Sequence, residues 1–218
     1  MKNDYSLQRD VLDELACEPS VHAERIGVSV RDGVVNLAGD VATYAEKIAA
    51  EDAAKRVAGV RAIVQELEVK LLGDHVRDDG DIAHAAKNAL DWHVSVPSGK
   101  VQAMVENGWV TLTGEVEWNY QRVAAHNAVR CLMGVKNLTD KVKVCGIKVS
   151  PAEVREKIVT AMKRSMKRDT DRITINVRDD KVILSGEVHS WEEYDEAGIA
   201  VWCAPGVAEV ENELTISI

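Results

Sequence analysis

GVVNLAG at residues 33–39, GWVTLTG at 108–114 and DKVILSG at 180–186 are three versions of one short pattern. In each, apolar residues alternate with polar or small ones and a glycine closes the segment. The closing glycines Gly39, Gly114 and Gly186 are separated by 75 and then 72 residues. Similarity at a nearly fixed period is typical of a chain built from tandem repeats.

A second motif repeats with the same spacing. A Gly-Val step follows each closing glycine by twenty residues, and its glycines are Gly59, Gly134 and Gly206. Two motifs that share both offsets indicate three copies of one unit, for which we expect boundaries at 1–73, 74–146 and 147–218. A unit of roughly seventy residues can bury only a modest core of its own.

Each copy opens with a predicted amphipathic helix. Aligning the copies on the two offsets brings apolar residues into rows at i, i+4 and i+8, which fits one face of a helix. These rows are Leu7, Val11 and Leu15, then Ile82, Ala86 and Leu90, then Val154, Ile158 and Met162. Apolar residues then recur at every second position in 26–30, 101–105 and 173–177, which predicts a half-buried strand.

A hairpin is predicted where this strand meets the opening pattern. The turn dipeptides are Asp32-Gly33, Asn107-Gly108 and Asp179-Asp180, and the first two suit a tight turn with positive φ at both positions. In that register Val30 faces Val35 and Val28 faces Leu37, so apolar residues share one side of the sheet. The opposite side is mostly polar, and we expect helices to cover only one face.

A second helix and a third strand complete each copy. The helix is clearest at residues 44–57, has counterparts that begin near Asn119 and Trp191, and ends at the Gly-Val step, where glycine suits a helix C-cap. A strand, a crossover helix and a strand place the third strand parallel to the second. The predicted fold class is therefore α+β, with three tandem αββαβ two-layer domains, each a three-stranded mixed sheet with two helices.

These motifs resemble the BON domain family of bacterial OsmY-like and nodulation proteins. The resemblance rests on a V-x-L-x-G segment at 35–39, 110–114 and 182–186 together with the Gly-Val step, and it covers nearly the whole chain. It implies an αββαβ fold, no catalytic activity and attachment to phospholipid surfaces in osmotic or envelope stress. The motif glycines are expected to serve backbone geometry rather than ligand binding.

Charge and hydropathy narrow the range of partners. The formal net charge of −9 opposes capture by nucleic acid, and an anionic surface could be bound only through a local basic cluster. No apolar run approaches the eighteen or so residues of a membrane span, and the first fifteen residues are too acidic for a signal peptide. We therefore expect a soluble, cytoplasmic protein, or a periplasmic one if a signal peptide was removed earlier.

Catalytic and metal-binding patterns are absent from the sequence. The histidines, at 22, 75, 84, 93, 126 and 189, occupy six unrelated positions of the repeat. The cysteines, at 17, 131, 145 and 203, show no CxxC spacing and are expected to be inert thiols. No phosphate-binding loop, dinucleotide fingerprint or zinc motif occurs. We predict no enzyme activity, no cofactor and no metal site.

One basic cluster is the best local candidate for binding an anion. It lies at and beyond the end of the first helix of the third copy and comprises Lys163, Arg164, Lys167, Arg168 and Arg172. Lysine and arginine residues beside an anionic membrane each contribute about 1 kcal/mol. The alternative is a solvated helix end, where cations favour the helix dipole without any partner.

Aromatic residues and one polar row are further candidates. Aromatic residues gather where the second helix begins, at Tyr44 in the first copy, Trp118 and Tyr120 in the second, and Trp191 and Tyr194 in the third. They fit either a lipid interface or ordinary packing. Trp109 is expected on the uncovered sheet face, as a contact with another repeat or a partner. Gln65, Asp140 and Asn212 interrupt the apolar row of the third strand, where a structural hydrogen bond explains them better than ligand binding.

Two functional hypotheses follow. The first is a non-catalytic adaptor in an osmotic or general stress response that binds an anionic phospholipid surface or a protein partner. The second is a cytosolic sensor of a small ligand or ion, which would bind in a crevice between repeats. Sequence leaves the oligomeric state open, since an open sheet face or edge can pair with another chain.

Overall fold

The computed structural model describes residues 3–145, 149–165 and 172–217. The chain forms two compact units, Met1–Val116 with Tyr120–Lys143, and Glu117–Asn119 with Val144–Ile218. The first unit contains nearly all of the first two sequence copies, and the second contains the third copy. In the described ranges, no helix combines the length and the apolar character that crossing a bilayer requires.

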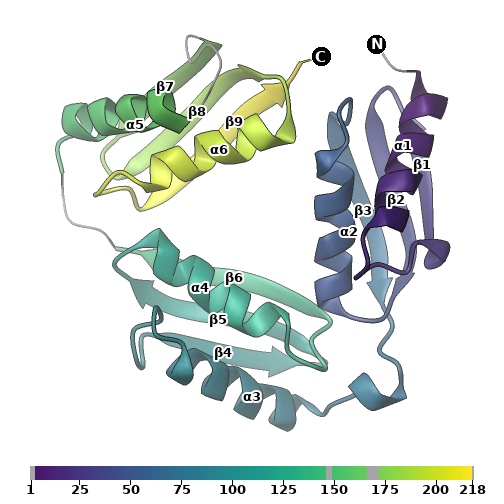
Figure 1. Ribbon diagram of the computed structural model, residues 1–218. Helices are drawn as coiled ribbons and strands as arrows, with labels where there is room; N and C mark the ends of the chain where they lie inside the picture. Colours follow the sequence, from purple (N-terminus) through teal and green to yellow (C-terminus); the bar gives the residue numbers. More distant parts are fainter. Residues whose placement is uncertain (1–2, 146–148, 166–171, 218) are drawn as a thin grey trace. The chain divides into compact units, whose positions relative to one another are not determined.

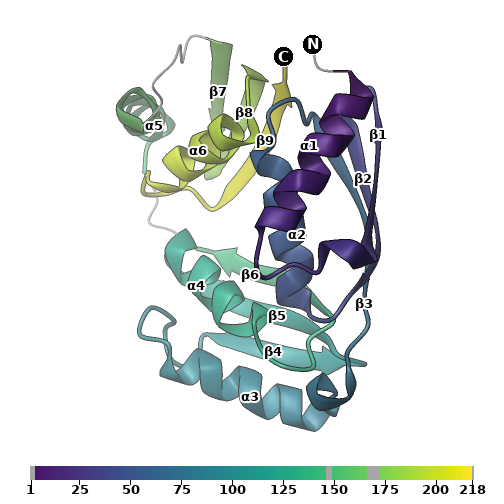
Figure 2. The same ribbon diagram turned by 45° about the vertical axis from the view of Figure 1, so that its right-hand side comes forward.

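The first copy follows the predicted order of helix, hairpin, helix and strand (Figure 1). Its elements are α1 (Asp4–Cys17), β1 (Ile26–Arg31), β2 (Val34–Val41), α2 (Tyr44–Arg56) and β3 (Ala62–Val69), with a short 3-10 helix, Ala23–Arg25, before β1. Strand β2 lies at the centre of the sheet, antiparallel to β1 and parallel to β3. Both helices lie on one face of this sheet (Figure 2).

The other two copies repeat this order. The second contains a 3-10 helix (Gly73–His75), α3 (Asp79–Trp92), β4 (Val101–Glu106), β5 (Trp109–Val116), α4 (Asn119–Arg130) and β6 (Asn137–Val144). The third contains α5 (Pro151–Ser165), β7 (Ile173–Arg178), β8 (Lys181–Val188), α6 (Trp191–Trp202) and β9 (Glu209–Ile216). Each of the three sheets has its second strand at the centre. The predicted α+β class with three tandem αββαβ domains is confirmed.

The predicted hairpin register is also confirmed. Val30 pairs with Val35 and Val28 with Leu37, and the equivalent residues pair in the same way in the other two copies. The first turn residue has a positive φ in every copy, at Asp32, Asn107 and Asp179. Because side chains alternate across a strand, this register sends Val28, Val30, Val35 and Leu37, and their counterparts in the other two copies, toward the helices.

Each copy buries its own apolar face. The largest fully buried side chains include Val11, Leu15, Val35 and Leu37, then Ile82, Val110 and Leu112, then Ile158, Met162 and Leu184. These come from the first helix and the second strand, the two rows that the repeat alignment predicts. In the third copy the core contains only residues of that copy. Burying one such side chain contributes about 1.5–3 kcal/mol.

A carboxylate at the start of the first helix holds the hairpin turn in two copies. Asp79 accepts hydrogen bonds from the backbone N–H groups of Asn107 at 2.7 Å and Gly108 at 2.8 Å. Asp4 makes the same two contacts in the first copy. The aligned residue of the third copy is Pro151, so the third hairpin, whose turn is Asp-Asp, lacks this latch.

The closing glycines are required by the backbone. Their φ angles are +134°, +142° and +128° for Gly39, Gly114 and Gly186, a region that other residues rarely adopt. A Cβ at any of them would overlap the carbonyl oxygen of the residue before the first strand, which is Arg25, Lys100 or Arg172. Backbone geometry therefore requires glycine at these three positions.

We expect Gly114→Ala to lower the free energy of unfolding of the first unit by about 1–3 kcal/mol, since it combines backbone strain with a backbone overlap. Urea denaturation followed by circular dichroism measures this. Gly73→Ala is the matched control, because an added Cβ there meets no atom within 4 Å. Equal stability of the two variants would contradict the assigned role.

Glu46 is a buried carboxylate that joins two segments of the first copy. Its side chain is 5% exposed and accepts the backbone N–H groups of His22 and Ala42 at 2.9 and 2.7 Å. The His22 ring lies 2.9 Å away, and the N–H of Glu46 donates to the hydroxyl of Thr43. Burial is the largest influence on the Glu46 pKa and raises it, but the hydrogen bonds from His22 and Ala42 together hold the pKa below its ordinary 4.5.

The lowered pKa makes the stability of the first copy depend on pH. A folded-state pKa below the unfolded value gives a contribution that is present above pH 4.5 and lost as pH falls through the folded-state pKa. We expect Glu46→Gln to be less stable than the natural chain at pH 7, with a difference that shrinks as the pH is lowered below 4.5. Thermal unfolding between pH 7 and pH 3 tests this, and a difference independent of pH would refute it.

Candidate anion-binding and contact surfaces

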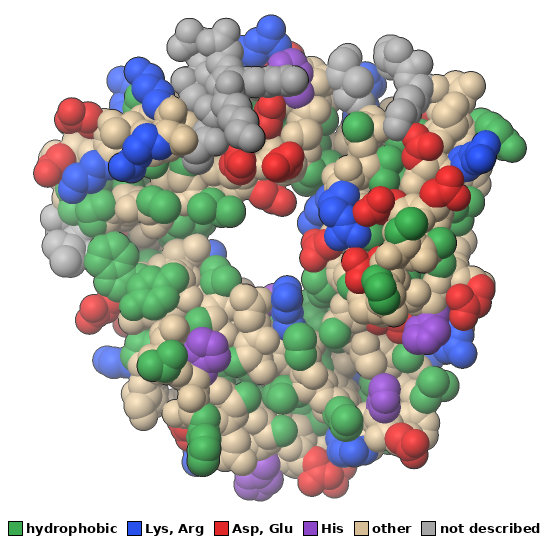
Figure 3. Space-filling view, in the orientation of Figure 1, with side chains coloured by type: hydrophobic (Ala, Val, Ile, Leu, Met, Phe, Trp, Pro, Cys, Tyr) green, Lys and Arg blue, Asp and Glu red, His purple; other side chains and the backbone are tan. Residues whose placement is uncertain are grey.

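The basic cluster of the third copy lies in part within the described structure. Lys163 and Arg164 are exposed in the last turn of α5, while Lys167 and Arg168 lie outside the described residues. Helix α5 carries four basic and two acidic residues, which contrasts with the net charge of −9 of the whole chain. Figure 3 shows Lys and Arg side chains gathered over this helix.

Arg172, the fifth member of the predicted cluster, has a local partner. It lies just before β7, and its guanidinium donates to Nε2 of His189 at 3.2 Å. Because arginine can only donate, His189 Nε2 is an acceptor here, and the other ring nitrogen faces the carbonyl oxygen of Ser217 at 3.3 Å. Arg172 is thus tied to the end of the third copy, and among the described members of the cluster the exposed cations of α5 are Lys163 and Arg164.

The aromatic residues near the start of the second helix do not form one common surface. Tyr44 is buried in the first copy, whereas Trp118 and Tyr120 are exposed in the second. Trp191 and Tyr194 contact each other with ring centroids 5.2 Å apart, and the Tyr194 hydroxyl donates to the carbonyl of Asn212. Packing therefore accounts for the aromatic residues of the first and third copies.

Trp109 lies on the uncovered sheet face, as the hairpin register predicts. It is 56% exposed, and its neighbour Val110 is buried on the opposite face. Met104 is on the same face and is 63% exposed. An exposed tryptophan beside an exposed methionine is an uncommon feature of a solvated sheet and is typical of a contact surface.

The polar row of the third strand has the structural role that its position predicts. The Gln65 amide donates to the carboxylate of Glu51 at 2.8 Å, and the Asn212 amide donates to the Tyr194 carbonyl at 3.3 Å. In the second copy, Asp140 accepts the N–H of Val142 at 2.9 Å. Each polar side chain therefore has a partner within its own copy, which satisfies it without a ligand.

The second copy alone places a histidine in this seam between helix and strand. His126 of α4 is half-buried, and Arg122 lies 3.7 Å from Asp140. Burial lowers the pKa of His126, Asp140 acts in the opposite direction, and nearby Arg130 and Arg122 lower the pKa further. The aligned residues of the other copies are Glu51 and Gly198, so this arrangement is not a property of the repeat.

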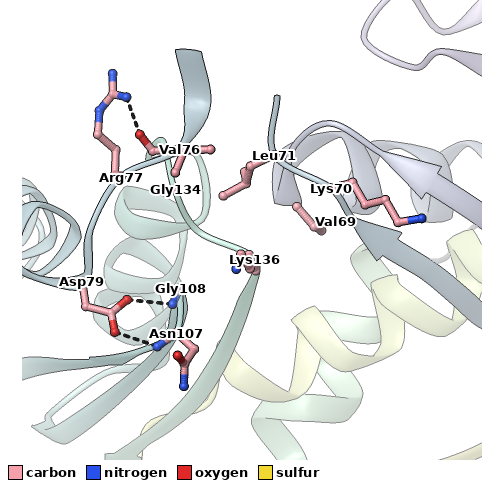
Figure 4. Close-up of a pocket in the computed structure, with 10 residues that line it drawn as sticks. All are labelled: Val69, Lys70, Leu71, Val76, Arg77, Asp79, Asn107, Gly108, Gly134 and Lys136. Carbon is pink, nitrogen blue, oxygen red and sulfur yellow. Dashed lines mark hydrogen bonds between the residues drawn. The ribbon is translucent and has the colours of Figure 1, made fainter. Parts of the chain in front are cut away.

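A hollow of about 470 Å³ lies in the first unit, and sequence reasoning did not predict it. Figure 4 shows it where the end of β3 and the following connector meet the turns of the second copy. Its lining comprises Val69, Lys70, Leu71, Val76, Arg77, Asp79, Asn107, Gly108, Gly134 and Lys136. These residues come from four separate stretches, and no local motif marks them.

Most polar groups of this hollow are already engaged. Arg77 donates to the carbonyl oxygens of Asp74 and Val76, and Lys70 pairs with Asp40. The carboxylate of Asp79 holds the hairpin turn, as Figure 4 shows. The lining of the hollow is therefore more polar than apolar, but few of its charged groups are free among the described residues.

Clusters of metal-ligating side chains are absent from the part of the chain that the structure covers. Among these residues no group of three His, Cys, Asp or Glu could hold a metal ion. All four cysteines are exposed and free. The described structure thus defines a tandem αββαβ protein with one open face on each sheet and surface features suited to binding.

Comparison with known proteins identifies the family. The family model for the BON domain matches residues 3–70, 78–146 and 150–217. The chain therefore belongs to the BON domain family and carries three tandem copies of the domain. BON domains are in general non-enzymatic and are associated with phospholipid binding.

Other comparisons add little. No curated protein matches the chain. Two solved structures of CdsD, a structural protein of the type III secretion system of Chlamydia trachomatis, are similar at 12% identity with a TM-score of 0.28. The alignments cover 97% and 100% of this chain and 92% and 100% of those chains, the second of which is the C-terminal domain of CdsD.

Proposed function

We propose that this protein is a non-catalytic adaptor that binds anionic phospholipid surfaces in an osmotic or general stress response, with Lys163 and Arg164 as the main contact. The observation that carries the proposal is the pair of exposed cations at the end of α5. Neither side chain has an acidic partner within the described residues. Lys167, Arg168 and Arg172 extend the cluster in the sequence.

The sizes of the electrostatic contributions allow a local contact with an anionic membrane despite the net charge of −9. The acidic residues elsewhere act over a Debye length of about 8 Å at physiological ionic strength, so distant ones are largely screened. Each Lys or Arg at an anionic membrane contributes about 1 kcal/mol, so the cluster supplies about 2–5 kcal/mol. Binding of this size is weak and depends strongly on salt, which suits a reversible peripheral association.

We expect the natural chain to co-sediment with vesicles containing phosphatidylserine or phosphatidylglycerol, and not with pure phosphatidylcholine vesicles. Neutralising four residues, Lys163→Gln, Arg164→Gln, Lys167→Gln and Arg168→Gln, is expected to reduce the bound fraction at least about tenfold, because the removed charges supply most of the attraction. Raising the salt from 50 to 500 mM is expected to have a similar effect.

A matched control removes two charges elsewhere. Arg9 and Lys87 are exposed cations on α1 and α3, and Arg9→Gln with Lys87→Gln leaves the basic cluster intact. We expect this control to bind vesicles like the natural chain. Binding that is lost equally in the control, or that does not require anionic lipid, would refute the assigned site.

The hollow in the first unit favours a second candidate function, a sensor of a small ligand. Its apolar wall of Val69, Leu71 and Val76 lies beside the amine of Lys136, which has no partner among the described residues. Such a site suits a small amphiphilic anion. Thermal shift with medium-chain carboxylates, nucleotides and inorganic salts tests this candidate, which predicts a rise in melting temperature that is lost in Lys136→Gln.

A further inference from the structure

The first and second copies both expose apolar side chains on their open sheet faces. The face of the second copy, defined by Trp109, Met104 and the outward residues of β4, β5 and β6, is here called the Trp109 face. The face of the first copy, defined by Val34, Val64 and the outward residues of β1, β2 and β3, is called the Val64 face. Val34 is 37% exposed and Val64 is 44% exposed. Both faces therefore carry an apolar centre without a cover.

The third strands of these two faces carry opposite charges at equivalent positions. Glu66 and Glu68 point outward from β3, and the residues 75 positions later are Lys141 and Lys143 of β6. All four are exposed, and none forms an ion pair within the described residues. Two surfaces with reversed charges at equivalent positions of the same fold are complementary in charge.

The third copy lacks this arrangement. Its outward lysine, Lys181 of β8, already pairs with Glu209 and Glu211 of its own sheet. The positions equivalent to Lys141 and Lys143 are Glu213 and Thr215. The face of the third copy thus satisfies its own cation and presents only one of the two acidic positions, so it is the weaker partner for the Trp109 face.

We propose that the Trp109 face binds the Val64 face of a second copy of this chain. The two faces belong to the same compact unit, and both are exposed in it, so they do not cover each other within one chain. A second molecule provides the complementary face with the same fold and the opposite charge. Glu106 and Glu115 lie at the ends of β4 and β5, and the lysine pair of the edge strand β6 is the basic part of the Trp109 face.

The size of the faces favours a reciprocal dimer. In each sheet two strands have eight residues and one has six, which gives a face of about 350 Å². A stable interface buries about 800 Å² on each partner. If each chain offers both faces, two such contacts bury about 700 Å² on each partner by the same strand dimensions, which is close to that size. A two-fold symmetric dimer provides two equal contacts and closes the assembly.

Charge exchange between separate variants gives a direct test. One variant carries Lys141→Glu with Lys143→Glu, and the other carries Glu66→Lys with Glu68→Lys. Each variant alone has like charges on both faces, so we expect its self-association constant to fall at least about tenfold below that of the natural chain. An equimolar mixture restores opposite charges at every contact and is expected to associate like the natural chain. Sedimentation velocity from 10 to 300 μM in low salt detects a species of twice 23.9 kDa.

The remaining measurements separate this proposal from other occupants. An unchanged circular dichroism spectrum and melting temperature show that the fold of each variant is intact. The Trp109→Ser variant keeps both charge pairs and is expected to associate more weakly than the natural chain. A natural chain that stays monomeric at 300 μM, or a mixture that does not associate, overturns the proposal. A third outcome is a natural chain that is monomeric and a Lys141→Glu, Lys143→Glu variant that loses vesicle binding. The Trp109 face would then bind a membrane, and the proposal would be overturned.

Discussion

The pairing of the two hairpin strands is the constraint on which each copy of this protein depends. With Val35 and Leu37 opposite Val30 and Val28, the large apolar side chains at these paired positions point to the same side of the sheet. The two helices have no other surface to cover, and the third strand can then pair only along the free edge of the second. Displacing the register by one residue would place the same side chains in water, at a cost of several buried residues at about 1.5–3 kcal/mol each.

The three copies keep this framework and differ around it. The latch from Asp4 or Asp79 to the hairpin turn is replaced by Pro151 in the third copy, where the turn itself is acidic. The polar seam contains Gln65 with Glu51 in the first copy and Asn212 with Tyr194 in the third. Partners have changed together within each copy, which is expected when a buried polar group must remain satisfied. These internal positions stabilise each copy, whereas the surface residues can differ from one copy to the next.

The three copies differ most on their surfaces, and these differences are the ones that bear on function. The third copy gathers cations at the end of α5, while the second exposes Trp109 and two lysines of β6 that form no ion pair with any residue the structure describes. A protein that binds a membrane through one copy and itself through another would present several lipid sites at once. Weak sites that are linked in this way bind far more tightly than one alone. The two proposals are independent, yet together they explain why three similar domains share one chain.

The sequence by itself determined the repeat, the order of elements, the hairpin register and the need for glycine at Gly39, Gly114 and Gly186. These features follow from local periodicity and backbone geometry, which neighbouring residues specify. It also placed Trp109 on the open face and identified the polar row at Gln65 as structural. Local pattern was sufficient because each of these properties depends on one strand or one turn.

Only the tertiary structure decided which side chains have partners. Arg172 was expected with the other cations, but its contact is His189, seventeen residues away. Tyr44 and Trp118 occupy similar places in the repeat, and only the packing of their copies buries one and exposes the other. The hollow beside Gly134 draws on four stretches of chain and has no signature in any of them. Contacts between distant residues depend on side-chain direction and packing in three dimensions, which periodicity along the chain does not encode.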